Sequence, residues 1–132
     1  MRKYLLHVLI ISFVFLLAPT VQAAPYKDEK RIEDAKEEVR KNPDDADAHL
    51  NLGLAYYGSG NYKEAIESYK QAIEIDPDEA KAHFLLGLAY LQLNDKGSAL
   101  EQYEILENLD SELAKELFDE IYRDLISQRV IE

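Results

Sequence analysis

Two histidines and a set of paired acidic residues are the side chains in this sequence that could support chemistry. His49 and His83 lie 34 residues apart, and two imidazoles could help to hold a metal ion. A tetrahedral site needs all its ligands around one centre, whereas residues one structural period apart are spread along a molecule. We therefore predict that the histidines pack between helices and that the chain has no metal site.

The acidic residues occur mainly as sequence neighbours, such as Asp44 with Asp45 and Asp78 with Glu79. Acid–base catalysis requires carboxyl groups that converge on one pocket and differ in environment. Neighbouring carboxylates suit helix capping and solvation better. The sequence also has no nucleophile elbow, phosphate-binding loop or His-Glu-x-x-His motif. We predict a protein that is not an enzyme, with no cofactor and no small-molecule substrate.

The charge of the chain limits its partners. The sequence carries 26 acidic and 15 basic residues, with a formal net charge of −11. A surface this acidic repels phosphate backbones and anionic lipid headgroups, so we expect no nucleic-acid ligand. The sequence contains no cysteine, which excludes disulfides, cysteine-based metal sites and a lipid anchored through cysteine.

Residues 1–23 are typical of a secretory signal peptide. Arg2 and Lys3 precede an apolar run over 4–18, and Val21 and Ala23 supply small residues before a cleavage site at Ala24. The run is shorter than the ~20 apolar residues of a membrane span. We predict export to a periplasm or to the outside of the cell. The alternative is an uncleaved leader that anchors the chain in a membrane through residues 4–24.

An internal repeat organises the rest of the chain. A shift of 34 residues aligns the blocks 46–79 and 80–113 without a gap. Many aligned positions are identical, and most of these carry residues of buried type. The identical pairs are Ala46/Ala80, Ala48/Ala82, His49/His83, Leu52/Leu86, Gly53/Gly87, Leu54/Leu88, Ala55/Ala89, Tyr56/Tyr90, Ala65/Ala99, Glu67/Glu101, Tyr69/Tyr103 and Asp76/Asp110.

Each block is predicted to form two helices. Leu50, Leu54 and Tyr57 follow helical spacing in the first half of block one. Residues 58–60 (Gly-Ser-Gly) form the turn, and a capping-box pattern at Asn61 and Glu64 marks the second helix.

Helix ends and helix crossings also have sequence signals. Pro77 is expected to end the second helix, and Asp78 is expected to cap the next helix along the chain. Gly53 and Ala65 fall where the two helices of a block should cross closely. The large tyrosines, including Tyr69 and Tyr103, are expected to fill the space between neighbouring helices.

This pattern closely resembles the tetratricopeptide repeat (TPR). The matching residues of block one are His49, Leu52, Gly53, Tyr56, Ala65, Tyr69, Ala72 and Pro77, and those of block two are His83, Leu86, Gly87, Tyr90, Ala99 and Tyr103. The departures are histidine for the family's frequent tryptophan, Leu106 for alanine and Ser111 for proline. The resemblance implies an all-α fold, a TPR-type helix-turn-helix α-solenoid.

The flanks extend the predicted solenoid, since about three repeats are normally needed for stability. Residues 28–43 look like the second helix of a partial repeat and its turn. Residues 111–129 are predicted to be a C-terminal capping helix, with a stripe formed by Leu113, Leu117, Ile121 and Leu125 and with Phe118 beside it.

The resemblance also implies a protein-binding groove, lined by the first helix of each repeat. The corresponding residues are Asp47, Leu50, Leu54 and Tyr57 in block one and Lys81, Phe84, Leu88 and Leu91 in block two. TPR domains that grip the C-terminal carboxylates of chaperones use Lys and Asn where Leu50 and Leu54 stand here. We therefore expect an apolar helix or an extended peptide as the ligand. The alternative is that the chain's own helices cover these residues.

The predicted function is that of a non-catalytic adaptor or scaffold that binds an unidentified protein in the cell envelope. The alternative is a structural subunit of an envelope complex, either self-associating as a homo-oligomer or anchored in the membrane through an uncleaved leader.

Overall fold

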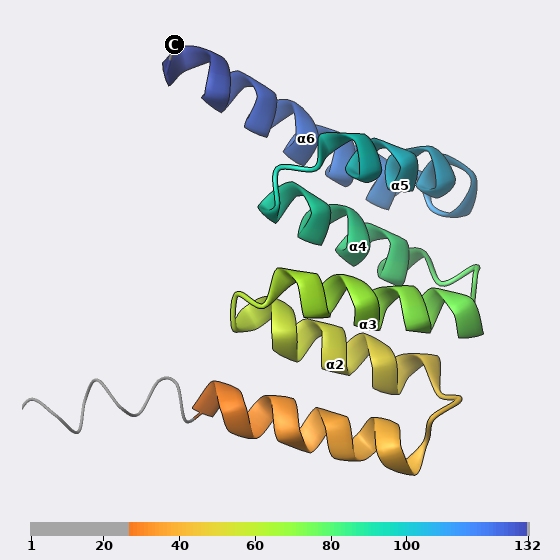
Figure 1. Ribbon diagram of the computed structural model, residues 1–132. Helices are drawn as coiled ribbons and strands as arrows, with labels where there is room; N and C mark the ends of the chain where they lie inside the picture. Colours follow the sequence, from red (N-terminus) through yellow and green to blue (C-terminus); the bar gives the residue numbers. More distant parts are fainter. Residues whose placement is uncertain (1–26, 132) are drawn as a thin grey trace, which may run out of the picture.

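Helices and short turns make up the described part of the chain. The computed structural model describes residues 27–131, and it shows helices stacked one after another along one direction (Figure 1). The helices are residues 27–41, α2 (Ala46–Gly58), α3 (Tyr62–Ile75), α4 (Ala80–Gln92), α5 (Lys96–Leu109) and α6 (Ser111–Ile131). Within residues 27–131 no strand occurs, so the predicted all-α fold is confirmed.

Acidic side chains cap the N-termini of several helices, as the sequence predicts. Asp45 Oδ1 accepts a hydrogen bond from the Asp47 amide at 3.0 Å, and α2 starts there. Asp95 begins α5, where it accepts from the Ser98 amide at 3.1 Å and from the Ser98 hydroxyl at 2.7 Å. These bonds hold the pKa of Asp95 below its usual value. Each bond satisfies backbone or side-chain donors at a helix start.

Two of the predicted caps are wrong. Asn61 precedes α3 but makes no side-chain capping bond, so the predicted capping box does not form. Glu79, and not Asp78, caps α4, where it accepts from the Lys81 amide at 3.1 Å. The Asp78 amide instead donates to Asp76 within the preceding turn. The residue that caps depends on how the chain leaves the previous helix, which is not visible in residue type alone.

The turn within each block requires a left-handed backbone. Gly60 has φ +77° in block one, and Asn94 has φ +59° in block two. Glycine and asparagine are the residues that adopt this conformation most readily. The two blocks therefore make equivalent turns with different residues.

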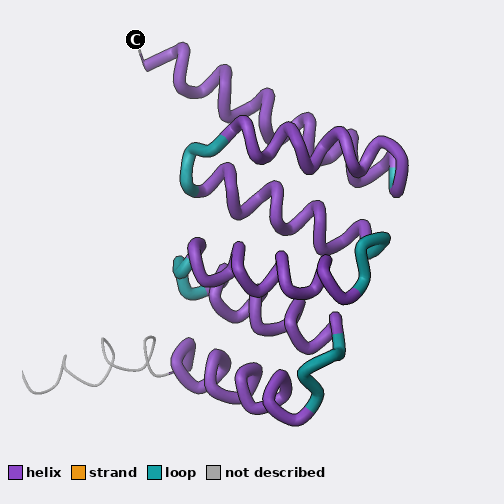
Figure 2. Tube along the Cα trace, turned by 45° about the vertical axis from the view of Figure 1, so that its right-hand side comes forward, coloured by secondary structure: helices purple, strands orange, loops and turns teal. Residues whose placement is uncertain are grey.

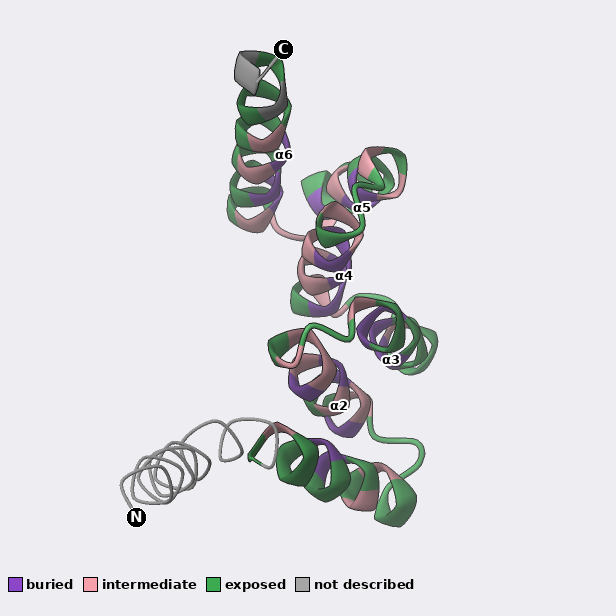
Figure 3. Cartoon of the chain, turned by 60° about the vertical axis from the view of Figure 1, so that its left-hand side comes forward, coloured by how far each residue is buried: buried purple, intermediate pink, exposed green. Residues whose placement is uncertain are grey.

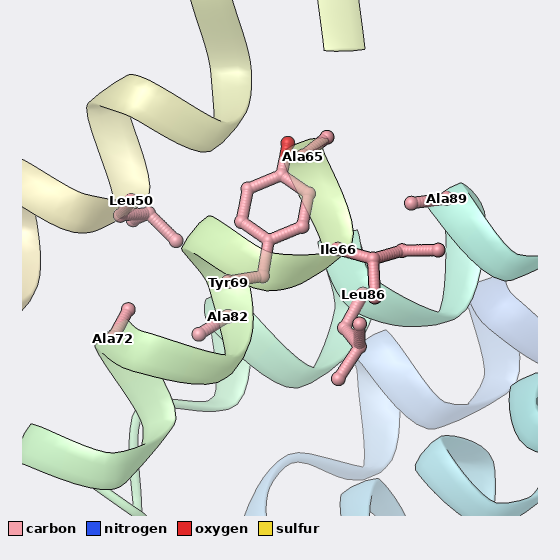
Figure 4. Close-up of a cluster of buried hydrophobic side chains, with 8 residues drawn as sticks. All are labelled: Leu50, Ala65, Ile66, Tyr69, Ala72, Ala82, Leu86 and Ala89. Carbon is pink, nitrogen blue, oxygen red and sulfur yellow. The ribbon is translucent and has the colours of Figure 1, made fainter. Parts of the chain in front are cut away.

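The core consists of clusters between successive helices. Leu50, Tyr69 and Leu86 belong to the cluster of α2, α3 and α4, and Figure 4 shows the Tyr69 ring among them. A second cluster joins α4, α5 and α6 around Leu106 and Leu117. Residues 27–41 pack on α2 through Ile32 and Ala35. Each helix therefore buries its apolar side only because a neighbouring helix covers it.

The helices form two layers. α2, α4 and α6 lie on one side of the stack, and α3 and α5 lie on the other (Figure 3). Each helix contacts the next in the chain, and α4 also contacts α6 directly. Figure 2 shows the same succession of antiparallel helices from another side. This is the predicted helix-turn-helix solenoid.

None of the described helices is long and apolar enough to cross a membrane. The predicted signal peptide, residues 1–23, lies outside the described residues.

Candidate protein-binding surface

Each histidine lies in the first helix of its repeat, and its side chain hydrogen-bonds to the turn that precedes that helix. His49 Nε2 lies 2.8 Å from the carbonyl oxygen of Pro43, and His83 Nε2 lies 2.9 Å from that of Pro77. A carbonyl oxygen only accepts, so each Nε2 carries a proton. His83 Nδ1 also lies 2.9 Å from the side-chain amide of Gln102. The signal for this role is the proline six residues before each histidine, which the sequence reasoning did not use.

Among residues 27–131, no group of three histidine or acidic residues is arranged to hold a metal ion. One member of each named pair, Asp45 and Glu79, lies at a helix start and accepts from a backbone amide. No arrangement of these side chains in the described structure suggests acid–base chemistry.

The burial of Leu50 shows that one residue of the predicted groove was wrongly assigned. Its side chain is only 3% exposed, and it lies in the core cluster with Tyr69 and Leu86. The alternative, that the chain's own helices cover these residues, holds at this position, because Leu50 belongs to the core cluster of α2, α3 and α4. Leu50 is therefore a core residue and is unavailable to a ligand in this structure.

Leu54 and Tyr57, from the same helix, are half-buried and remain partly accessible. Leu54 lines a cleft of about 370 Å³ between α2 and residues 27–41, together with Arg31 and Glu38. The Tyr57 ring packs edge-on against Tyr62, with 5.2 Å between ring centroids. Burial, followed by the nearby Tyr62, raises the pKa of Tyr57.

Leu88 and Leu91 meet the last helix. With Gln92 they line a cleft of about 350 Å³, which α6 closes on its other side. The α6 residues of this cleft are Glu120, Arg123, Asp124 and Ser127. The floor of the cleft is therefore apolar and its outer wall is charged.

The remaining predicted groove residues divide by exposure. Asp47 and Lys81 are exposed at the starts of α2 and α4. Phe84 is half-buried and packs against the cluster that contains Leu117 and Ile121 of α6. The structure thus leaves Phe84 partly covered, while it brings Leu88 and Leu91 together at an accessible cleft.

Tyr57 of α2 lies near residues of the next two helices on this side of the stack. Gln92 and Glu120 are both close enough to influence its pKa, although burial and Tyr62 have larger effects. Gln92 belongs to α4 and Glu120 belongs to α6. We call the surface formed by Leu54, Tyr57, Leu88, Leu91, Gln92, Glu120 and Arg123 the α2–α4–α6 face.

The sequence reasoning missed Gln92, Glu120 and Arg123. It placed the groove within the two matching blocks, and it treated the C-terminal helix as a cap or as a cover of the groove and not as one of its walls. Ion pairing gives further evidence that α6 belongs to the stack, because Lys96 Nζ of α5 lies 3.1 Å from Asp124 Oδ2 of α6.

Helical hairpins stacked in two layers define the class of the protein, an α-solenoid of repeats. Family models identify the repeat: residues 55–94 match "TPR repeat", and residues 80–113 match "Tetratricopeptide repeat". The second match spans the same residues as the second predicted block. Residues 55–113 of the chain therefore consist of tetratricopeptide repeats.

Solved structures agree with this assignment. The chain is similar to MamA of AMB-1, with 26% identity, TM-score 0.61, and coverage of 67% of this chain and 53% of that one. MamA residues 41 to the end from Desulfovibrio magneticus RS-1 match at 28% identity and TM-score 0.62, covering 70% and 52%. The chain thus spans about half the length of these MamA chains.

Peptide complexes are also among the similar structures. The second TPR of Spaghetti (RPAP3), bound to the HSP90 peptide SRMEEVD, matches at 27% identity and TM-score 0.60, covering 64% of this chain and 78% of that one. The TPR2B domain of yeast Sti1, in a complex with an Hsp70 peptide, matches at 24% identity and TM-score 0.68, covering 80% and 87%, which shows the shared fold. A search of curated proteins found no match.

Proposed function

We propose that the protein is a non-catalytic interaction module that binds an apolar helix or an extended peptide of another protein on its α2–α4–α6 face. The observation that carries the proposal is the accessible cleft that Leu88 and Leu91 of α4 form with α6. Two similar structures contain bound chaperone peptides, which supports a peptide-binding role for the fold.

The composition of the face favours an apolar ligand with some polar contacts. Leu88 and Leu91 offer half-buried apolar surface, while Glu120 and Arg123 beside them form an ion pair at 2.6 Å. Leu54 stands where a carboxylate clamp has an amide or a cation, so a C-terminal carboxylate has no dedicated partner at that position.

The expected affinity is modest. Full burial of each apolar side chain releases about 1.5–3 kcal/mol, but these residues are already partly covered. Association itself costs about 4–15 kcal/mol. A face of this size suggests affinities near ~1 μM, so stable complexes would need a second contact or several copies.

A pair of leucines near the end of α4 provides the test. Leu91 lines the cleft, whereas Leu93 lies just after α4, is exposed and does not line the cleft. We expect Leu91→Glu to abolish the capture of partner proteins from an extract of the native cells, and we expect Leu93→Glu to preserve it. Circular dichroism would check that both variants remain folded. Equal capture by the two variants would refute the α2–α4–α6 face as the binding site.

We also propose that the protein acts outside the cytoplasm, in a periplasm or as a secreted protein. The support is the signal-like pattern of residues 1–23. Intact mass of the protein purified from its native cells tests this, with a mature N-terminus at Ala24 as the expected result. A full-length mass in the membrane fraction would favour the anchored alternative.

A further inference from the structure

The last helix exposes an apolar row on the side that points away from the core. Phe118 is 45% exposed and Tyr122 is 57% exposed, and Leu125 and Ile126 are exposed as well. The Phe118 ring stacks on that of Tyr122 with centroids 6.3 Å apart, and it contacts Tyr103 of α5 at 5.5 Å. An exposed row of neighbouring aromatic and aliphatic side chains indicates an interaction surface.

A row with the same spacing occurs on α4, where neighbouring helices cover it. Ala82, Leu86 and Tyr90 of α4 have the same spacing as Ala114, Phe118 and Tyr122 of α6, at a distance of 32 residues. Leu86 and Tyr90 line a cleft where three helices meet, because α3 and α5 lie on either side of α4. Leu86 is only 3% exposed there. The equivalent row of α6 therefore has the geometry to receive a helix.

Among the described helices, only α5 borders the exposed row of α6. Tyr103 and Glu107 of α5 supply one wall of a cleft of about 250 Å³, and Ala114, Lys115 and Phe118 of α6 supply its floor. Within residues 27–131, no helix comes after α6. We call the surface formed by Tyr103, Glu107, Phe118, Tyr122, Leu125 and Ile126 the α5–α6 end.

The charge around this end differs from that of the corresponding internal site. Lys70 and Ile73 of α3 border the internal cleft, and the residues 34 positions later are Glu104 and Glu107. Glu107 and Glu104 both lie near Tyr103, where they contribute to its raised pKa. On α6, Asp119 is exposed one turn from Tyr122, and Lys115 is the basic residue of the cleft. The acidic residues around the α5–α6 end therefore favour a ligand with basic residues.

We propose that the α5–α6 end binds a basic amphipathic helix of another protein, which packs on α6 as α3 packs on α2 and as α5 packs on α4. Its apolar stripe covers Phe118, Tyr122 and Leu125, and lysine or arginine beside the stripe faces Glu104 and Glu107. This surface is separate from the α2–α4–α6 face. A second copy of the chain is the weaker occupant, because two chains with a net charge of −11 repel each other.

α3 supplies a suitable probe, because it is a second helix of this same solenoid. A synthetic peptide of residues 61–75 keeps the face that packs on α2 and α4, namely Ala65, Ile66, Tyr69 and Ala72. Glu67 and Glu74 are exposed, so Glu67→Lys and Glu74→Lys make the peptide basic without changing that face. The unsubstituted peptide is the acidic control.

Binding of the labelled basic peptide to the purified protein would be measured by fluorescence anisotropy. We expect saturable binding that weakens at least tenfold for Tyr122→Glu and for Leu125→Glu. Ile75→Glu is the control variant, because Ile75 is also an exposed apolar residue and lies at the end of α3. We expect it to leave the affinity unchanged, and we expect the acidic peptide to bind at least tenfold more weakly than the basic peptide.

Several results would overturn the proposal. Absence of saturable binding to the wild-type protein would do so, as would equal affinity for the wild type and Tyr122→Glu. Equal binding of both peptides at low and high salt would remove the role of charge. A dimer in light scattering that Tyr122→Glu dissociates would show that a second copy covers this end. Leu91→Glu should leave peptide binding intact, so failure here is distinguishable from failure of the proposed α2–α4–α6 face.

Discussion

Tyr69 and Tyr103 occupy the same position in the two repeats, yet one is core and the other is surface. The Tyr69 side chain is fully buried, and its hydroxyl has no hydrogen-bond partner in the described structure. Tyr103 is half-buried, and its hydroxyl donates to Glu107 Oε1 at 2.7 Å. The same side chain in the same register therefore has a different environment in each block.

The difference arises from the connection that leads out of each block. Residues 76–79 connect α3 to α4, whereas Asp110 alone connects α5 to α6. In block one the Tyr69 ring lies against Gly53, and a Cβ there would be 2.4 Å from its Cε1 atom. In block two it is Leu117 of α6 that lies against Gly87, and a Cβ there would be 2.6 Å from Leu117 Cδ2. A shorter connection thus changes which residue fills the site beside the glycine.

The largest expected effect distinguishes the two tyrosines directly. Tyr69→Ala should lower the free energy of unfolding by about 3–5 kcal/mol, because it leaves a large cavity between α2, α3 and α4. Tyr103→Ala should cost about 1 kcal/mol, because its ring is already partly in water. Urea unfolding monitored by circular dichroism measures both values. Similar losses for the two variants would contradict the assignment of one tyrosine to the core and the other to the surface.

Substitution of the two equivalent glycines tests the same difference, because each added methyl group meets the side chain that packs beside it. Gly53→Ala should destabilise the protein by about 1–3 kcal/mol, because the added methyl meets the buried Tyr69 ring. Gly87→Ala should cost less than about 1 kcal/mol. Its methyl meets the end of a leucine side chain, which can rotate, and alanine favours the helix by about 1 kcal/mol. If Gly87→Ala proved to be the more costly change in urea unfolding, the Leu117 side chain would be held more rigidly than the Tyr69 ring.

Much of the fold was predictable because it depends on short-range patterns that recur. The 34-residue period, the small residues Gly53 and Ala65, and Pro77 beyond the end of α3 each act within one or two helices. Tyr69 is buried as predicted. These features predict a helical solenoid regardless of what lies at the ends of the chain.

The candidate site was less predictable, since it depends on how whole helices lie against one another. Leu50 has the residue type and position of a groove residue, but α3 and α4 cover it. Leu125 was predicted to share a stripe with Leu117 and Ile121, but it is exposed while they are buried. A search at a shift of 32 residues would have aligned Tyr122 with Tyr90 and revealed that α6 resembles a first helix.

The smallest expected effect concerns the two hydroxyl groups. Burial, followed by the nearby Tyr57, raises the pKa of Tyr69, so the folded protein holds this proton to a higher pH than the unfolded chain does. Stability from this group is therefore fully present below pH ~10 and falls above it, by at most about 1.4 kcal/mol per pH unit. Tyr69→Phe removes a buried hydroxyl without a partner, so it should be neutral or stabilising by up to about 1 kcal/mol at pH 7. It should also make the stability fall less steeply between pH 10 and 12, as measured by urea unfolding.

Tyr103→Phe is the matched control, because it removes a hydroxyl group whose hydrogen bond to Glu107 is exposed. A Tyr69→Phe variant that lost stability at pH 7 would show that a water or another group satisfies the Tyr69 hydroxyl, and the contrast between the two repeats would then rest on ring burial alone.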